Sequence, residues 1–452
     1  MKKKIAVLLA ACLLSAAAIA PAFAEGGAAP SAKPAGAQEV LERLYTHISE
    51  DAKAEAPSLK PAAVRLTPEQ GKKLLSTMAE RAVKEHPDRF EAYVFRGAMY
   101  YTNGEKEKCF ADLDHAVTLA PENPLAYGSR AEFSARDGRD KEALQDWDKA
   151  LYLNPTDEVK DKVYMQRGLF HMSRKQYEAA ASDFKNDLKY VNPKLRFGVQ
   201  IFTGDCYAKL GKNGEAEKSY REAVKDNPKN PLCWDMLGHF YNFTMKQHDK
   251  AKECYDKALA LAPKSDMILR EAGVNEMGAK RMDRAVTYFT RAIEANPTHR
   301  LSYMLRGSCY SKLGLYDKAI QDYTKASGLE PENYRPYESL GYNYSLKKDY
   351  DKAIPWYEKA IALNPKSGEA YNNLGYTWFL KGNKDKALEY LNKAIEVSPA
   401  YAESYRSRAE VYESMGEFDK ALADMDHFVT LSPKDAKGRE FRNRLAEKAG
   451  HA

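Results

Sequence analysis

The side chains best suited to chemistry are scattered along this 452-residue sequence and form no catalytic motif. Its histidines are His47, His86, His115, His171, His239, His248, His299, His427 and His451, and they have no recurrent acidic or cysteine partner. The sequence contains no His-Glu-x-x-His, no paired Cys-x-x-Cys, no phosphate-binding loop and no Gly-x-Ser-x-Gly. It therefore predicts a protein that is not an enzyme and that binds no cofactor.

One group of residues has the types that ligate metals. His239 follows Cys233 and Asp235 within a single predicted helix, and zinc is bound by such nitrogen, sulfur and oxygen ligands. A single group of this kind in a long helical chain is far more often incidental. We therefore expect no metal site at these residues.

The elements that position the side chains are short amphipathic helices, and the clearest pair lies between Gly368 and Pro399. The first helix has one face at the spacing i, i+3, i+4 and i+7, formed by Tyr371, Leu374, Gly375 and Trp378. A second helix follows, which we expect Asp385 to cap. Two such helices cannot bury both apolar stripes alone, so they need copies on either side.

Helix-ending prolines recur along most of the chain and supply those copies. They are Pro87, Pro121, Pro155, Pro193, Pro228, Pro263, Pro297, Pro331, Pro365, Pro399 and Pro433, and most are 34 residues apart. A fixed period of this length is typical of repeats that stack into a solenoid.

The repeating pattern resembles the tetratricopeptide repeat, or TPR, over roughly four-fifths of the chain. One copy runs Trp234, Leu237, Gly238, Tyr241, Ala251, Tyr255 and Pro263, and another runs Tyr337, Leu340, Gly341, Tyr344, Ala353, Tyr357 and Pro365. The small first-helix residue recurs as glycine or alanine from Gly97 to Ala409, which lets the paired helix approach closely. The resemblance implies an all-α, right-handed superhelical solenoid of helix-turn-helix units with a capping helix at each end.

The pattern also predicts where each segment of the chain begins and ends. We expect a signal peptide at residues 1–24, a flexible Ala/Gly/Pro-rich lead at 25–38, and N-terminal helices with a degenerate capping repeat at 39–89. Ten repeat units should occupy 90–435, and a capping helix and tail should occupy 436–452. The spacing around Pro193 is longer than elsewhere, an extra residue near Thr244 predicts a longer turn, and Pro355 lies early in a second helix. These departures indicate either variation in loop length without functional meaning or a bend in the middle of the array.

The first residues resemble a bacterial-type secretory signal. Lys2, Lys3 and Lys4 precede an apolar run, which ends in a small-x-small cleavage site at Ala24. A membrane anchor is the competing interpretation, although the run is short and rich in alanine for a span. Lipidation of Cys12 is another, although that cysteine lies early in the apolar run. We expect an exported protein of the periplasm or cell envelope, with no membrane-spanning segment after cleavage.

Charge and cysteine content exclude two further classes of protein. The formal net charge of +6 includes the three signal lysines, so the mature chain carries +3 without a basic block, and nucleic-acid binding is not indicated. Five cysteines would remain after cleavage, and an odd, unpatterned set argues against a disulfide framework. Cys233 and Cys254 lie on the two helices of one repeat, and whether they form a disulfide stays open.

In TPR proteins the first helices line a concave groove, which the resemblance implies is the binding surface. Its slots would hold Met165, Leu169, Met172, Ile201, Phe243, Met267, Met277 and Met304, and then Tyr342, Asn372, Tyr376, Phe379 and Arg406. Methionine is flexible and polarizable, which suits adaptable apolar recognition. The alternative is that several of these residues pack between neighbouring first helices. The lysine slots of the carboxylate clamp found in chaperone-binding members hold Val94, Gly128, Met165 and Ile201 instead.

The sequence therefore predicts a non-enzymatic scaffold or adaptor that binds a protein or peptide segment in the groove, with a monomer favoured. A lipid-anchored envelope assembly factor and an envelope-glycan enzyme with an unrecognised site are the alternatives. The identity of the partner does not follow from these residues, because repeat number and patterning specify shape.

Overall fold

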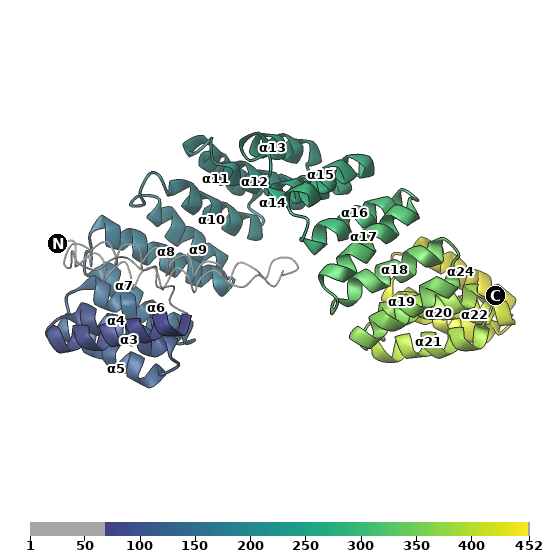
Figure 1. The fold of residues 1–452 in the computed structure, drawn as a ribbon, viewed down its shortest axis with the longest axis horizontal. Coiled ribbons are helices and arrows are strands. Elements are labelled where there is room, and N and C mark those ends of the chain that lie inside the picture. The colour runs from purple at the N-terminus through teal and green to yellow at the C-terminus, as the bar shows by residue number, and fades with distance from the viewer. Residues whose placement is uncertain (1–67, 451–452) are drawn as a thin grey trace, which may run out of the picture. The chain divides into compact units, whose positions relative to one another are not determined.

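The computed structural model describes residues 68–450, and every element within them is a helix (Figure 1). The predicted all-α class with paired helices is confirmed. The predicted signal peptide, the lead and Cys12 lie outside the described residues. No helix in the described part of the chain is both long and apolar enough to cross a membrane.

The chain divides into two compact units, Met1–Asn227 and Pro228–Ala452. The described helices of the N-terminal unit are α3 (Pro68–Glu85), α4 (Phe90–Thr102), α5 (Lys106–Leu119), α6 (Pro124–Arg136), α7 (Asp140–Tyr152), α8 (Asp157–Ser173), α9 (Tyr177–Asp187), α10 (Arg196–Lys209) and α11 (Asn213–Asp226). The C-terminal unit begins with α12 (Pro231–His239), the π-helix η2 (Phe240–Thr244), α13 (His248–Leu261), α14 (Asp266–Gly278), α15 (Met282–Ala295), α16 (Arg300–Lys312) and α17 (Tyr316–Leu329). It continues with α18 (Tyr334–Leu346), α19 (Tyr350–Leu363), α20 (Gly368–Leu380), α21 (Lys384–Val397), α22 (Ala402–Met415), α23 (Phe418–Leu431) and α24 (Ala436–Lys448).

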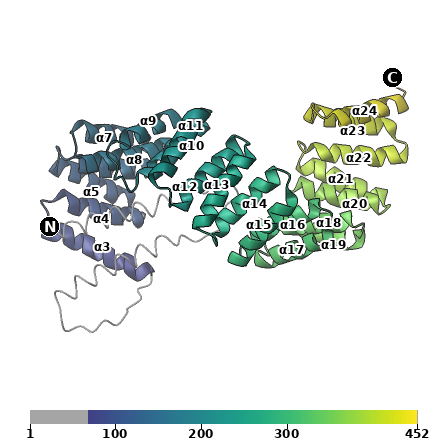
Figure 2. The ribbon, with the colours of Figure 1, turned by 90° about the horizontal axis from the view of Figure 1, so that it is seen from above.

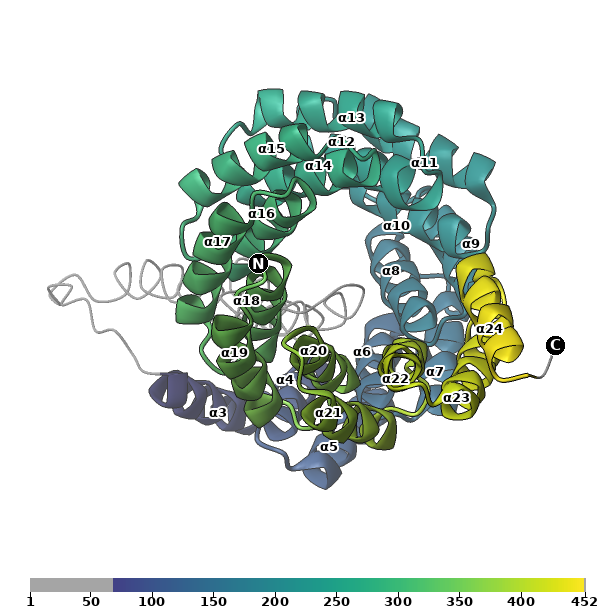
Figure 3. The ribbon, with the colours of Figure 1, turned by 90° about the vertical axis from the view of Figure 1, so that its right-hand side faces the viewer.

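Each even-numbered helix from α4 to α22 is the first helix of a pair, and the next odd-numbered helix is the second. Within the C-terminal unit, α18, α20 and α22 lie on one side of the stack, whereas α19, α21 and α23 lie on the other (Figure 3). Consecutive pairs in this unit stack side by side, ending with α24 against α23 (Figure 2). Side chains from successive first helices therefore share one surface.

Small residues at the predicted slot let the two helices of a pair approach closely. A Cβ added at Gly273 would lie 2.5 Å from Cε1 of Phe289, and one added at Gly341 would lie 2.8 Å from Cδ1 of Tyr357. These contacts are shorter than van der Waals contact permits, so the aromatic ring of the second helix occupies the space that a side chain would need. The close approach inferred from the sequence is confirmed.

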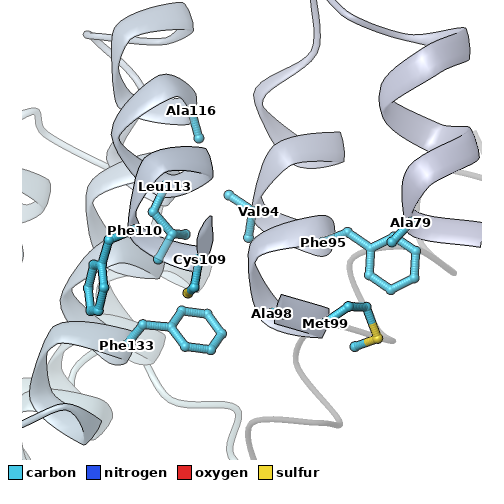
Figure 4. Close-up of a cluster of buried hydrophobic side chains, with 10 residues drawn as sticks. All are labelled: Ala79, Val94, Phe95, Ala98, Met99, Cys109, Phe110, Leu113, Ala116 and Phe133. Atoms are coloured by element: carbon cyan, nitrogen blue, oxygen red, sulfur yellow. The ribbon is translucent and has the colours of Figure 1, made fainter. Parts of the chain in front are cut away.

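The first apolar core of the N-terminal unit joins α3 to the repeats. Ala79 of α3 packs with Phe95 and Met99 of α4, while Phe110 of α5 and Phe133 of α6 extend the same cluster (Figure 4). Helix α3 thus covers the apolar side of α4, which would otherwise face water.

Five repeats contain a buried ion pair that the sequence analysis missed. In each, an arginine on the first helix donates two hydrogen bonds of 2.6–2.9 Å to an aspartate 16 residues later. The pairs are Arg96–Asp112, Arg130–Asp146, Arg167–Asp183, Arg306–Asp322 and Arg408–Asp424. Arginine occupies the slot that holds Leu237, Leu340 and Leu374 in three other repeats, and this exchange is the signal that would have revealed the pairs.

The structure corrects two local predictions. The extra residue near Thr244 does not lengthen a turn, because the π-helix Phe240–Thr244 absorbs it at the end of α12. The second helix of the clearest repeat is capped by Asn383, whose side chain accepts a hydrogen bond from the Lys386 N–H at 3.0 Å, and not by Asp385. The irregular spacing around Pro193 corresponds to a first helix of 17 residues, α8, and a short second helix of 11 residues, α9.

Candidate functional site

The main cavity of the C-terminal unit has a volume of about 1100 Å³ and lies among the first helices α16, α18, α20 and α22. Six of the residues that line it are tyrosines, namely Tyr316, Tyr323, Tyr334, Tyr342, Tyr376 and Tyr401. We call this cavity the tyrosine pocket. Of the predicted groove residues, it brings together Met304, Tyr342, Asn372, Tyr376 and Arg406.

The 34-residue period explains how side chains far apart in the sequence reach one pocket. Met304, Glu338, Asn372 and Arg406 occupy the same slot on four successive first helices, and each lines the pocket. The residue four positions later, one helical turn further along, lines it too, as Ser308, Tyr342, Tyr376 and Glu410. At the core positions similar residue types recur from repeat to repeat, whereas at these two positions the residue type changes. The chemistry of the pocket therefore varies from one repeat to the next.

Glu338 is a half-buried carboxylate on the wall of the pocket. The Ser367 hydroxyl donates a hydrogen bond of 2.6 Å to its Oε1. Burial raises the pKa of Glu338 to about 7, with a smaller contribution from the negative charge of Glu369, while the Ser367 hydrogen bond and Arg335 act in the opposite direction. Glu338 is therefore balanced between its two protonation states near neutral pH.

A second acidic contact joins α20 and α22. The Tyr376 hydroxyl donates a hydrogen bond of 2.9 Å to Oε2 of Glu410. Burial, followed by the charge of Glu410, raises the pKa of Tyr376 to about 12, so its hydroxyl keeps the proton that it donates. On α22, Arg406 forms an ion pair of 2.5 Å with Glu403. These contacts fix the side chains at the α22 end of the pocket.

Two amide groups in the pocket have hydrogen-bonding capacity that the protein does not use. The Oδ1 atoms of Asn343 and Asn372 are buried and accept no hydrogen bond from the described residues. Both side chains line the pocket, and Asn372 is only 5% exposed. Unsatisfied buried acceptors are costly, so a ligand that donates hydrogen bonds here would offset part of that cost.

The predicted groove residues of the N-terminal unit contribute to its core. Met165, Leu169 and Met172 are half-buried and pack against a cluster that contains Phe184, while Ile201 is 6% exposed. They fill the space between neighbouring repeats, which is the alternative left open by the sequence. The expectation of an exposed apolar surface is therefore wrong for Ile201 and holds only partly for the other three.

The remaining predicted residues differ in exposure. Met277 packs beside Phe289, and Phe379 packs beside Leu391, so both belong partly to the core. Phe243 and Met267 expose 42% and 45% of their surfaces, outside the tyrosine pocket.

The cysteines and histidines do not form a metal-binding group in the part of the chain that the structure describes. Cys233 and Cys254 are buried and form no disulfide, and the same holds for Cys109, Cys206 and Cys309. Among residues 68–450, no group of three or more histidine, cysteine, aspartate or glutamate side chains has the arrangement of a metal site.

Comparison with family models identifies the repeats. Models described as "Tetratricopeptide repeat" match residues 90–123, 202–230, 233–265, 301–333, 368–401 and 402–435, and one described as "TPR repeat" matches 341–382. This chain therefore contains tetratricopeptide repeats in both units, and its fold is that of a protein-interaction scaffold.

Parts of this chain are similar to known proteins in sequence or in structure. Tetratricopeptide repeat protein 13 of Homo sapiens is 28% identical over 164 residues, which are 35% of this chain and 18% of that protein. The peroxisomal targeting signal receptor of Saccharomyces cerevisiae is 25% identical over 197 residues, 41% of this chain and 30% of the receptor. The chain thus spans less than a third of either relative. A tetratricopeptide repeat protein of Parabacteroides merdae has a crystal structure that covers 55% of this chain and 98% of its own, at 20% identity and a TM-score of 0.47.

Proposed function

We propose that this protein is a non-enzymatic scaffold that binds a segment of a partner protein in the tyrosine pocket. The observation that carries the proposal is one position on the four first helices, repeated every 34 residues around the pocket. It holds a methionine, a glutamate, an asparagine and an arginine in turn. Such a surface offers an apolar, an anionic, an amide and a cationic contact in sequence. An elongated ligand with varied side chains matches it better than a small, uniform molecule does.

The tyrosines favour a polypeptide ligand for a second reason. Tyrosine offers a large apolar face and a hydroxyl at little cost in conformational entropy, which is why it is enriched at protein interfaces. The unsatisfied amide oxygens of Asn343 and Asn372 suit the N–H groups of a peptide backbone. The yeast relative is named as a receptor for a targeting signal, which is consistent with recognition of a protein segment by such repeats.

We further propose that the protein acts in the bacterial cell envelope after removal of residues 1–24. The support is the sequence pattern around Lys2–Lys4 and Ala24. The intact mass of the mature protein tests this proposal. A chain that begins at Glu25 supports export with cleavage, an acylated N-terminal Cys12 supports the lipid-anchored alternative, and retention of Lys2–Lys4 contradicts both.

Site-specific crosslinking tests the peptide-binding proposal. A photoreactive amino acid replaces Tyr342, which is 49% exposed in the pocket, and a control protein carries it at Tyr152, which is 81% exposed in the N-terminal unit. We expect the Tyr342 probe to form a defined adduct that the Tyr152 probe lacks, and mass spectrometry of the adduct gives the sequence of the bound segment.

The recovered segment is then synthesised and titrated against the full chain and its variants. Tyr376→Ala and Arg406→Ala should each weaken binding about tenfold, since aromatic and arginine residues dominate such interfaces. Equal adducts at Tyr342 and Tyr152, or unchanged affinity in both variants, would show that the pocket is not the binding site.

A further inference from the structure

The C-terminal unit contains a second group of acidic residues, outside the tyrosine pocket. Asp235 lies on α12, and Glu271 lies on α14. The Nδ1 atom of His239, at the end of α12, is 3.4 Å from Oε2 of Glu271, so the group bridges two successive first helices. None of these three residues lines the tyrosine pocket.

The two carboxylates keep oxygen atoms that no described residue hydrogen-bonds. Oδ1 of Asp235 is buried without a hydrogen-bond partner among the described residues, and Asp235 is only 5% exposed. Oε2 of Glu271 is also buried and accepts no hydrogen bond, although it has the 3.4 Å contact with His239. The Glu271 side chain is 31% exposed, which leaves an approach from solvent. A buried carboxylate without a partner is expensive, so its retention calls for a group that pairs with it.

Electrostatics show that no lysine or arginine supplies that group. Burial and then the charge of Glu271 raise the pKa of Asp235 to about 7, and His239 alone lowers it. Burial and then the charges of Glu271 and Asp235 likewise raise the pKa of Tyr255, on α13. The group therefore places two carboxyls in electrostatic contact, and no lysine or arginine is among the groups that lower the pKa of Asp235.

Buried aspartates at one recurring second-helix position have an arginine partner. Asp322 and Asp424, for example, each accept two hydrogen bonds from an arginine 16 residues earlier in the chain. Asp235 lies on a first helix and not at that second-helix position, and the arginine position of its own repeat holds Leu237. The structural role that explains the other aspartates does not explain this one.

We propose that Asp235 and Glu271 form a subsite for the basic side chain of a partner segment, an arginine or a lysine. Two carboxylates suit a guanidinium group especially well, because it donates several hydrogen bonds in a fixed plane. The His239 ring forms one wall, held against Phe243 at a ring separation of 4.4 Å.

The surroundings define the residues that flank the basic side chain. Leu232, Phe243 and Met267 expose 40%, 42% and 45% of their surfaces on the same two first helices and η2. Leu232 lies three residues before Asp235 and Met267 four residues before Glu271, so each shares a helix face with one carboxyl. Exposed apolar side chains beside a carboxyl fit a segment in which a basic residue stands between apolar ones. Phe243 and Met267, which the sequence predicted as partner-binding residues, would contact the apolar side chains on either side of the basic residue.

Two peptides that differ only in charge test the subsite. One is a fluorescein-labelled heptapeptide with a central arginine between leucine and phenylalanine residues, and its twin carries citrulline, the neutral analogue of arginine. Fluorescence anisotropy with the full chain should show at least tenfold tighter binding of the arginine peptide. Asp235→Asn and Glu271→Gln should each reduce this preference several-fold, and together they should abolish it.

The controls separate charge recognition from folding and from the tyrosine pocket. Glu294→Gln changes an exposed carboxylate on the second helix α15 and should leave the preference intact. Tyr376→Ala alters the pocket and should also leave it intact, so failure of the proposed function and failure of this subsite remain distinguishable. Asp235→Asn is isosteric, and circular dichroism verifies that the variant is folded.

Several results would overturn the proposal. They are binding of neither peptide, equal binding of both, or persistence of the preference in the double variant. The basic side chain could also come from a second copy of this chain. Light scattering of the unliganded protein tests for this self-association. Association that Asp235→Asn abolishes would assign the subsite to self-assembly and not to a partner segment.

Discussion

At the scale of single residues, one exchange accompanies the buried aspartate that recurs on the second helices. Arg306 replaces the leucine of the repeat pattern, and Asp322 lies 16 residues later with two hydrogen bonds to it. At Leu340 and Leu374, where leucine is retained, the residue at the same spacing is aromatic, Trp356 and Tyr390. Arg306 and Asp322 therefore depend on each other, since either charge would be unfavourable in this partly buried place without the other.

Removing one member of this pair should cost far more than removing both. Asp322→Ala leaves the Arg306 charge inside the repeat, where its side chain is only 17% exposed, and we expect a loss of about 3 kcal/mol in the free energy of unfolding. The double variant Arg306→Leu with Asp322→Tyr should recover to within about 1 kcal/mol, since apolar replacement of buried pairs is often neutral. Urea unfolding followed by circular dichroism measures both values.

Asp249→Ala is the matched control for this prediction. It removes a carboxylate that is 82% exposed and 2.7 Å from Arg281, and such surface pairs contribute about 0–1 kcal/mol. Equal losses in Asp322→Ala and Asp249→Ala would show that burial does not make the recurring pair important.

Glu338 gives the tyrosine pocket a pH dependence whose sign follows from its raised pKa. The folded protein holds the proton up to about pH 7, whereas the unfolded chain releases it near the ordinary value of 4.5. The contribution of Glu338 to stability is therefore full below pH 4.5 and falls as the pH rises toward 7. Glu338→Gln should unfold like the wild type at pH 4 and be more stable by up to ~3 kcal/mol at pH 8.

Urea titrations at both pH values compare Glu338→Gln with Glu294→Gln, which changes an exposed carboxylate. The Ser367 hydroxyl can still donate to the amide oxygen of the variant, so the comparison isolates the charge. A difference between Glu338→Gln and wild type that stays constant from pH 4 to pH 8 would contradict the raised pKa.

At the scale of elements, the turn between the two helices of a pair requires a residue in the left-handed conformation. Glycine supplies it in most repeats, with positive φ angles at Gly104, Gly138, Gly211, Gly314, Gly382 and Gly416. Four repeats use lysine instead, at Lys175, Lys246, Lys280 and Lys348, with φ between 54° and 61°. A side chain costs roughly 1–2 kcal/mol in this conformation, so these turns carry local strain.

Exchanging the two residue types tests that strain. Lys348→Gly should raise the free energy of unfolding by about 1 kcal/mol, because glycine adopts the φ angle of 61° without strain. This value is a net gain, since the greater conformational entropy of glycine in the unfolded chain offsets part of the strain that is removed. Gly314→Lys, in the neighbouring repeat, should lower it by a similar amount. Urea midpoints measure both, and a stabilising Gly314→Lys would contradict the argument.

The element scale also shows what the sequence could predict. Helix pairs, their period and the close approach at Gly273 follow from spacing alone, because each repeat must bury the same stripe against the next. The π-helix Phe240–Thr244 does not follow, since an inserted residue fits equally well into a turn or a helix until packing decides.

The candidate site was predictable only in part. Tyr342, Asn372, Tyr376 and Arg406 were expected on the first helices, and they line one pocket. The burial of Ile201 was not foreseen, because a groove-facing slot in the repeat pattern does not reveal how closely the next first helix approaches. The burial of Asp235 and its unsatisfied Oδ1 likewise emerge only when the neighbours of its side chain are known.

At the scale of the whole molecule, the chain forms two compact units, and each buries its own large aromatic residues. Trp147 and Phe184 are buried in the N-terminal unit, and Phe289, Tyr357 and Phe428 are buried in the C-terminal unit. In a repeat array, stability is approximately a sum of the repeats and their contacts with nearest neighbours. Division of the chain at residues 227–228 should therefore leave two parts that fold.

We expect the fragment 228–452 to fold alone and to retain the tyrosine pocket, all of whose lining residues lie between Met304 and Glu410. Circular dichroism should give a cooperative unfolding transition that matches one of two transitions of the full chain. A fragment of residues 273–452, which begins inside α14, is the control. It loses half of that helix and all of α13, so it should unfold at lower urea concentration. If the full chain unfolded in one transition and the fragment 228–452 stayed unfolded, the two units would be a single cooperative body.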